Sequence, residues 1–283
     1  MKKHLLLFFF LLFDIIIFYL IKFNIINKKN EIYVTLTSFK ERINCINKTL
    51  DILLSNTIKP KKIILNLSTE EFPNKELDLP QNILVLLKKY SNFEIFWVKK
   101  NTKVFKKLIP TLNRFHLQDL VITVDDDILY PKNLFGKMIK CYNKYGRKNP
   151  VSFGSKYSDW KINGKIINSH YGSATIVKSQ YFNNKINEIY NNTTKNLINK
   201  GIKCFDDVLY TYAALLNGYL YKRCKEYSIK RFVDISPKFN LSVSENNNME
   251  IGNQMLGYHN IIRKYIKKRY NITIQKLIKK IKN

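Results

Sequence analysis

The sequence predicts an α/β fold in which helices flank a mostly parallel sheet. Short runs rich in Val, Ile and Leu alternate with segments whose apolar residues recur at helical spacing. One run, residues 120–124, is apolar throughout, which is typical of a strand buried on both faces. It leads directly into Asp125, Asp126 and Asp127. Three adjacent carboxylates must be solvated, paired with basic groups or bound to a cation, and ligands gather at the carboxyl ends of parallel strands.

The first half of the chain supplies most of this sheet. Strands are expected where β-branched and aromatic residues concentrate, at residues 31–37, 62–67, 93–98 and 120–124. Helical spacing is found at residues 43–54 and 106–112, and an irregular segment is expected around residues 72–80. This order predicts parallel strands with both faces covered. Neither a G-x-G-x-x-G nor a P-loop sequence is present, so a dinucleotide or Walker-type site has no support.

The second half is less regular. Pro131 suits the first position of a helix whose apolar face continues to Tyr142. A short strand at 151–153, a loop at 154–165, a strand ending at Val177 and a polar helix or loop at 179–200 follow. The next helix ends at residues 217–218.

Asp206 and Asp207 lie in or just before the first turn of the helix that ends at residues 217–218. The helix dipole favours negative charge at this position. The alternative is that one of the two serves only as an N-cap.

Composition allows one large core or two modest ones, with 45% hydrophobic residues in a chain of 283. The formal charge of +28 would by itself indicate nucleic acid or an anionic membrane surface. The excess is mostly Lys, dispersed through a chain rich in Ile and Asn, and no nucleic-acid-binding module accompanies it. We therefore expect no nucleic-acid partner.

The four cysteines are scattered and form no C-x-x-C pair. They are Cys45, Cys141, Cys204 and Cys224. This pattern predicts reduced structural thiols of an intracellular domain, without zinc or disulfides.

Residues 5–21 are almost continuously apolar and predict a retained membrane anchor, delimited as residues 1–27. More positive charge follows this segment than precedes it, so the main domain, residues 28–258, is expected in the cytoplasm. A type II anchor with the domain outside is the alternative. Asp14 makes either orientation costly.

The tail, residues 259–283, predicts one or two basic amphipathic helices. Ile262, Ile266, Tyr270, Ile274 and Ile278 recur every four residues among lysines and arginines. Such a helix either lies on a membrane surface or docks on the domain with its basic face solvated.

Four motifs in order carry a family resemblance. They are Val34-Thr35-Leu36-Thr37-Ser38-Phe39 with Arg42, then Lys106-Lys107-Leu108-Ile109-Pro110, then Val124-Asp125-Asp126-Asp127-Ile128-Leu129-Tyr130-Pro131, then Asp206-Asp207-Val208. The set resembles bacterial glycosyltransferases of the GT-A fold, closest to family-2-like enzymes that build surface polysaccharides such as lipopolysaccharide or capsule. The resemblance extends from Glu31 to Gly218.

The resemblance implies a UDP- or GDP-sugar donor, a glycan or lipid-linked acceptor, and Mn²⁺ or Mg²⁺ beside the donor's diphosphate. Asp127 would bind the metal directly, and Asp125 would lie near the ribose or the metal's waters. In an extended segment Asp125 and Asp127 point to one side and Asp126 to the other, and Asp126 could take either role if the backbone turns there.

The remaining roles follow from the same resemblance. Asp207 would be the general base of an inverting transfer and Asp206 would orient the acceptor. Donor and acceptor contacts are implied for Thr37 and Ser38 at the nucleoside, Arg42 and one of Lys106 and Lys107 at the diphosphate, and Gly172 and Ser173 where the backbone approaches a sugar. His259 is placed late enough to be an additional metal ligand, although a lone histidine is more often structural.

Two other functions compete with this one. Haloacid-dehalogenase-like phosphohydrolases also place Asp-x-Asp after a buried strand and use Mg²⁺, but that strand usually opens the domain. A non-catalytic basic protein of the membrane surface is the second alternative.

Overall fold

The computed structural model describes residues 31–153, 160–162, 165–168, 174–202, 204–224 and 247–282. The anchor predicted at residues 1–27 lies outside these ranges. Within them, no helix is both long and apolar enough to cross a membrane. Residues Ile32 to Asn283 form one compact unit.

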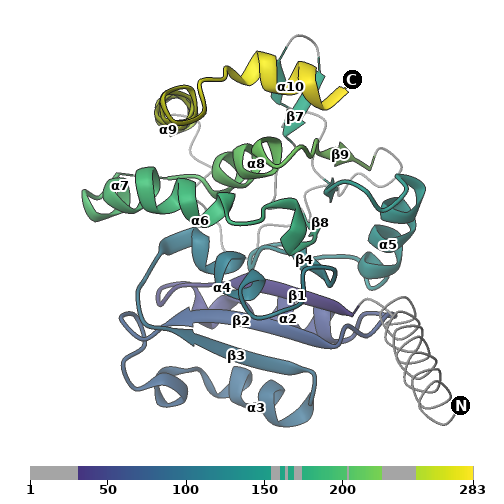
Figure 1. The fold of residues 1–283 in the computed structure, drawn as a ribbon. Coiled ribbons are helices and arrows are strands. Elements are labelled where there is room, and N and C mark those ends of the chain that lie inside the picture. The colour runs from purple at the N-terminus through teal and green to yellow at the C-terminus, as the bar shows by residue number, and fades with distance from the viewer. Residues whose placement is uncertain are drawn as a thin grey trace, which may run out of the picture. The chain divides into compact units, whose positions relative to one another are not determined.

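A seven-stranded sheet of order β3-β2-β1-β4-β8-β5-β9 forms the centre of this unit (Figure 1). The strands are β1 (Ile32–Thr37), β2 (Lys62–Ser68), β3 (Phe93–Val98), β4 (Leu120–Thr123), β5 (Val151–Ser152), β8 (Thr175–Val177) and β9 (Lys222–Arg223). The first four run parallel, whereas β8 is antiparallel to β4 and β5. The predicted mostly parallel α/β sheet is confirmed, and β9 is an addition.

The register of β1 and β4 decides where the site lies. Thr35 pairs with Thr123, so two residues further on Thr37 and Asp125 reach the same edge of the sheet. Burial supports the assignment of β4 as a central strand, because all four of its residues are buried. The aspartates follow where the chain leaves the core.

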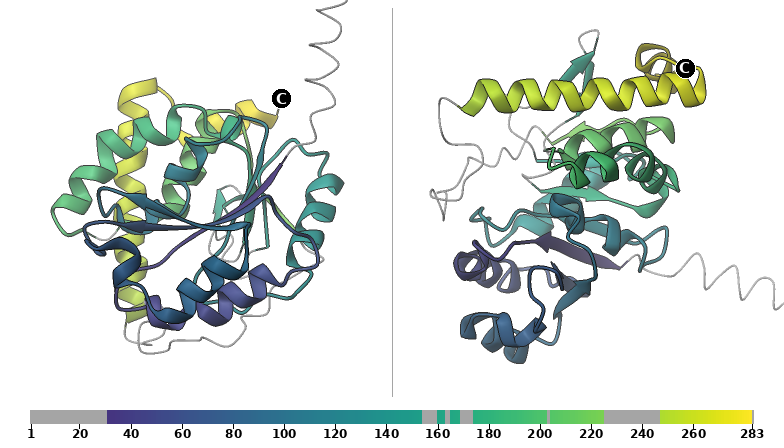
Figure 2. Two further views of the ribbon diagram at one scale, coloured as in Figure 1. Left: turned by 90° about the horizontal axis from the view of Figure 1, so that it is seen from below. Right: turned by 90° about the vertical axis from the view of Figure 1, so that its left-hand side faces the viewer.

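Helices cover the sheet. The α-helices are α2 (Asn47–Leu54), α3 (Gln81–Lys89), α4 (Ile109–Leu112), α5 (Leu134–Lys144), α6 (Lys185–Ile189), α7 (Lys195–Asn199), α8 (Asp206–Leu216), α9 (Asn247–Tyr270) and α10 (Ile274–Lys282). The shorter turns are η1 (Ile43–Cys45), η2 (Lys75–Asp78), η3 (Lys103–Lys107), η6 (Ser179–Tyr181) and the π-helical η7 (Tyr190–Thr194). In Figures 1 and 2, α6 and α8 lie between the sheet and α9.

Three elements differ from expectation. Helix α3 was not predicted, although it follows Pro80 and buries Ile83 and Leu86. Helix α5 begins at Leu134 rather than at Pro131, after a turn closed by the Leu134 amide on the Pro131 carbonyl. The segment expected to be a loop, residues 154–165, contains strand β6 (Trp160–Ile162), which forms an antiparallel hairpin with β7 (Lys165–Asn168).

The tail forms two helices whose apolar face packs on the domain. Ile262 and Ile266 are fully buried, and Ile274 and Ile278 are nearly so. Lys264, Lys267, Lys268 and Arg269 remain exposed on the other face. Docking with a solvated basic face is therefore the alternative that the structure favours. Helix α9 also runs through the domain boundary expected at residues 258 and 259.

Two of the four cysteines are joined, which makes the expectation of reduced cysteines wrong for this pair. Cys141 and Cys224 form a disulfide with their Cα atoms 6.0 Å apart. Strand β9 pairs with β5, which follows α5, so residues 83 positions apart in sequence become neighbours. Spacing along the chain carries no sign of this proximity. Cys45 and Cys204 are free.

Candidate active site

A cavity of about 510 Å³ lies at the carboxyl edge of the parallel strands. The end of β1, the aspartates that follow β4 and the first turn of α8 line it. Its lining residues are Thr37, Ser38, Phe39, Glu41, Arg42, Glu71, Asn101, Lys103, Val104, Lys106, Lys107, Asp125, Asp126, Asp127, Asp206 and Asp207. Apart from His259, all the predicted site residues within the described ranges therefore line one cavity. Gly172 and Ser173 lie outside those ranges.

Lys107 joins the two acidic groups of the cavity. Its Nζ lies 2.7 Å from Asp125 Oδ1 and 3.3 Å from Asp206 Oδ2. The Lys107 backbone is itself held, because its carbonyl accepts hydrogen bonds from the Thr35 hydroxyl and from the Asn66 amide. The acidic turn after β4 and the start of α8 thus share one buried ammonium group.

Arg42 pairs with the other two aspartates of the turn. Its Nη1 lies 2.7 Å from Asp126 Oδ1 and 3.1 Å from Asp127 Oδ2. The alternation expected for an extended segment does not apply here, because the backbone bends at Asp126 and Asp127 and all three aspartates line the cavity. The Asp125 amide closes this bend by donating to the Tyr130 hydroxyl at 2.8 Å.

Lys106 occupies a different wall from Lys107. It is 2% exposed, and its ammonium donates to Glu71 and, at 2.9 Å, to Asn101 Oδ1. Sequence analysis missed Glu71 and Asn101. Each follows a predicted parallel strand, β2 or β3, so its position after a strand end was the available signal.

Burial dominates the electrostatics of the acidic groups. Desolvation raises the pKa of Asp125 to about 7, against the opposing effect of Lys107. Desolvation likewise raises the pKa values of Asp126 and Asp206, opposed by Arg42 and Lys107 respectively. Desolvation would lower the pKa of Lys107, but Asp125 and Asp206 outweigh it and raise that pKa well above its usual value. Lys107 is therefore charged at neutral pH.

The cavity carries a formal excess of negative charge. Seven acidic and four basic side chains line it, which gives a balance of −3 if all are ionised. Hard carboxylate oxygens of this kind suit Mg²⁺ or Mn²⁺. Within the described ranges, however, no three His, Cys, Asp or Glu side chains are already arranged to hold a metal ion.

His259 lies away from the cavity lining. It is 2% exposed, and its Nδ1 lies 2.9 Å from the Tyr212 hydroxyl, which also accepts a hydrogen bond from Arg263 Nε at 2.7 Å. Desolvation lowers the pKa of His259 to about 3. These contacts give it a structural place between α8 and α9.

Comparison with known proteins gives no family. No protein-family model and no curated protein match the chain. Among solved structures, S. aureus TarS 1–349 has a TM-score of 0.47 at 17% identity over 69% of this chain and 58% of that one. A Francisella tularensis 2-C-methyl-D-erythritol 4-phosphate cytidylyltransferase has a TM-score of 0.43 at 13% identity over 80% of this chain and 100% of that one. The glycosyltransferase GlyE of Streptococcus pneumoniae TIGR4 has a TM-score of 0.39 at 12% identity over 70% of this chain and 46% of that one.

The chain thus spans 58% of the TarS fragment, of which complexes with UDP and UDP-GlcNAc are also known. Any function must be inferred from the cavity's own side chains.

Proposed function

We propose that this protein is a GT-A glycosyltransferase that moves a sugar from a nucleoside diphosphate to a hydroxyl of a glycan or lipid-linked acceptor. One observation carries the proposal. A single cavity joins the aspartates that follow a central parallel strand to the acidic first turn of α8, with Lys107 between Asp125 and Asp206. This gives one acidic group that would hold a cation beside the donor's diphosphate and a second for proton transfer.

The chemistry assigned to α8 is general base catalysis. The acceptor oxygen attacks the anomeric carbon, the bond from that carbon to the diphosphate oxygen breaks, and the nucleoside diphosphate leaves with the electron pair. Asp207 takes the acceptor hydroxyl's proton, and Asp206 orients the acceptor. Direct attack of this kind inverts the anomeric centre.

The cavity's basic groups suit a diphosphate. Arg42 and Lys107 are held by the aspartates at its edge, so their charge is already oriented when the donor binds. Thr37 and Ser38, at the end of β1, suit the nucleoside. Gly172 and Ser173 keep their proposed role beside a sugar.

A divalent cation fits the charge of this cavity. An acidic excess would repel a diphosphate, so donor binding needs further positive charge. Asp127 and Asp125 would hold Mn²⁺ or Mg²⁺, and the ion would neutralise charge developing on the leaving diphosphate. The protein's own part is to hold these carboxylates in place through Arg42 and Lys107.

Membrane anchorage through residues 1–27, a cytoplasmic catalytic domain and a role in surface-polysaccharide synthesis are parts of the same proposal. They rest on the sequence patterns and the resemblance.

The phosphohydrolase alternative is less well supported. Its aspartate motif should follow the strand that opens the domain, whereas β1, β2 and β3 precede β4 in this chain. Its nucleophile would be the first aspartate, and Asp125 is paired with Lys107.

A screen of UDP- and GDP-sugars tests the proposal. The full-length protein should hydrolyse one donor slowly and gain thermal stability from the matching nucleotide, both only with Mn²⁺ or Mg²⁺. Absence of hydrolysis and of stabilisation with every donor would contradict the proposal. A burst of phosphate release from a phosphomonoester would instead identify a phosphohydrolase.

A further inference from the structure

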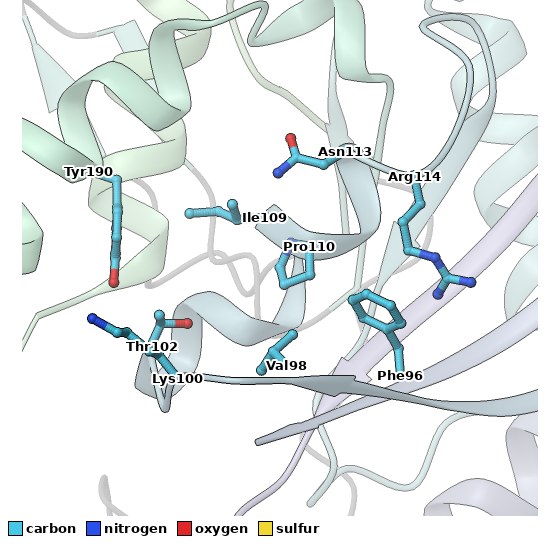
Figure 3. Close-up of a pocket in the computed structure, with 9 residues that line it drawn as sticks. All are labelled: Phe96, Val98, Lys100, Thr102, Ile109, Pro110, Asn113, Arg114 and Tyr190. Carbon is cyan, nitrogen blue, oxygen red and sulfur yellow. The ribbon is translucent and has the colours of Figure 1, made fainter. Parts of the chain in front are cut away.

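A second cavity, of about 390 Å³, lies beside the candidate active site. Figure 3 shows the residues that line it. It is formed by the end of β3, the segment that follows, α4 and the first residue of η7. Its lining residues are Phe96, Val98, Lys100, Thr102, Ile109, Pro110, Asn113, Arg114 and Tyr190. Its volume falls within the range of roughly 300–1,000 Å³ for small-molecule sites. The function proposed above does not use it.

The walls of this cavity are apolar and aromatic. Phe96, Val98, Ile109 and Pro110 face it, and Figure 3 shows Tyr190 on the opposite side from Phe96. The Arg114 guanidinium lies 4.2 Å from the centre of the Phe96 ring and 2.8 Å from Glu94, so its charge is already neutralised. Arg114 therefore acts as part of the wall.

The rim is polar and has hydrogen-bonding capacity to spare. Among the residues that the structure describes, the side chains of Lys100, Thr102, Asn113 and Tyr190 make no hydrogen bond or ion pair within the protein. Apolar walls with a few unused polar groups at the edge are typical of a site that orients a small ligand.

The chemistry of the cavity selects a class of ligand. A sugar ring has C–H faces that pack on aromatic and proline rings, and hydroxyls at its edge that bond to amide, hydroxyl and ammonium groups. A hydrocarbon chain would leave the rim groups without partners. A phosphate group would find Lys100 as its only cation without a carboxylate partner among the lining residues.

Position connects this cavity to the active site. Asn101, Lys103, Lys106 and Lys107 line the first cavity, whereas Lys100, Thr102, Ile109 and Pro110 line the second. One segment of chain, residues 100–110, thus lines both cavities, which makes them neighbours.

We propose that the second cavity binds a sugar ring of the acceptor, distal to the reacting hydroxyl, so that the acceptor is an oligosaccharide rather than a single sugar. This inference rests on the proposed function, because it assigns the ring to the acceptor of that reaction.

Saturation-transfer NMR with a panel of hexose and N-acetylhexosamine disaccharides tests the site. At least one disaccharide should bind the full-length protein, and Tyr190→Ala and Asn113→Ala should each weaken that binding about tenfold. Asn184→Ala is the matched control, since Asn184 is exposed, caps no helix with its side chain and lies outside both cavities. Donor hydrolysis should stay within about twofold of wild type in all three variants.

The outcomes separate the two proposals. If the wild type hydrolyses a donor but binds no disaccharide, or if Asn113→Ala binds as tightly as Asn184→Ala in a folded protein, the second site is overturned. If no donor is hydrolysed, the result contradicts the proposed function, and disaccharide binding then tests the second site alone. Asn113 is exposed, so its substitution tests the site even where Tyr190→Ala unfolds the chain.

Discussion

Lys107 is the residue on which the geometry of the candidate site depends. Its side chain is 9% exposed, and its ammonium neutralises carboxylates from two elements that are far apart in sequence. Removing it leaves Asp125 and Asp206 with uncompensated charge in a largely desolvated position, which is costly.

Replacing Lys107 by Met should therefore destabilise the fold by roughly 3 kcal/mol in urea unfolding at pH 7.5. Lys99→Met is the matched control, because Lys99 is exposed and lines neither cavity. Equal stability of the two variants would contradict the ion-pair assignment.

Variants of Asp207 and Asp127 test the proposed catalytic function separately from the stability of the fold. Asp207→Ala and Asp127→Ala should each lower transfer by roughly 10²–10⁴-fold with unfolding midpoints close to that of wild type. Asp51→Ala, on the exposed face of α2, should retain full activity. Persisting transfer in both site variants would refute these roles and leave a non-catalytic surface protein as the better explanation.

Most of the residues that line the first cavity could be predicted from the sequence, because charged residues at predicted strand ends must meet at one sheet edge. The sequence could not assign their partners. That Lys107 bridges Asp125 and Asp206, while Lys106 turns to Glu71, depends on the direction of two successive side chains in η3. Periodicity does not resolve such a short 3₁₀ turn.

At the scale of elements, the interface of α8 with α9 supports the helix that carries the acidic turn. His259 from α9 is buried there against the Tyr212 hydroxyl, which also bonds to Arg263, and burial lowers its pKa so that it stays neutral. Because its folded pKa of about 3 is below the unfolded value of 6.5, the unfolded chain binds an extra proton as pH falls below 6.5.

The burial of neutral His259 therefore leaves the free energy of unfolding independent of pH above 6.5, and lowers it by up to about 1.4 kcal/mol for each pH unit below 6.5. Asp125, whose raised pKa acts in the opposite direction, is present in both proteins, so the loss should appear as a stability advantage of wild type over His259→Gln that shrinks between pH 7.5 and 5 in urea unfolding. His116→Gln, at an exposed position, should leave the slope of stability against pH unchanged. An unaltered slope in His259→Gln would mean that His259 protonates in the folded state.

The two faces of α9 give a second comparison at this scale. Ile266 is fully buried and Ile261 is 39% exposed. Ile266→Ala should cost about 2–5 kcal/mol of unfolding free energy, and Ile261→Ala about 0.5 kcal/mol or less. Equal small effects would mean that the tail does not dock and would revive the membrane-surface interpretation.

Strands were easier to predict than the elements around them. Runs such as residues 62–67 are apolar enough to exclude other structures, whereas α3 contains Val85 and Leu87 beside its buried Ile83 and Leu86, which blurs its helical pattern. Strand β9 has two residues and exists only through its pairing with β5. Local sequence carries little information about such elements.

At the scale of the whole molecule, the disulfide joins α5 to the residue that follows β9. Cys141 follows the acidic turn of β4, and Cys224 follows α8, so the closed loop contains Asp206 and Asp207 but not Asp125. A link across 83 positions restricts the unfolded chain much more than it restricts the folded one.

Removing the link should therefore lower the free energy of unfolding by about 2–5 kcal/mol. The unfolding midpoint should fall both in Cys141→Ala/Cys224→Ala and in wild type treated with dithiothreitol. Dithiothreitol should leave the double variant unchanged, and Cys45→Ala, which removes a free thiol, should still respond to it. If the reductant shifts none of these midpoints, the two thiols are unlinked in solution. A persistent disulfide would bear on topology as well, because such bonds are rare in reducing compartments. It would favour the type II anchor, with the catalytic domain outside, over the cytoplasmic orientation proposed from flanking charge.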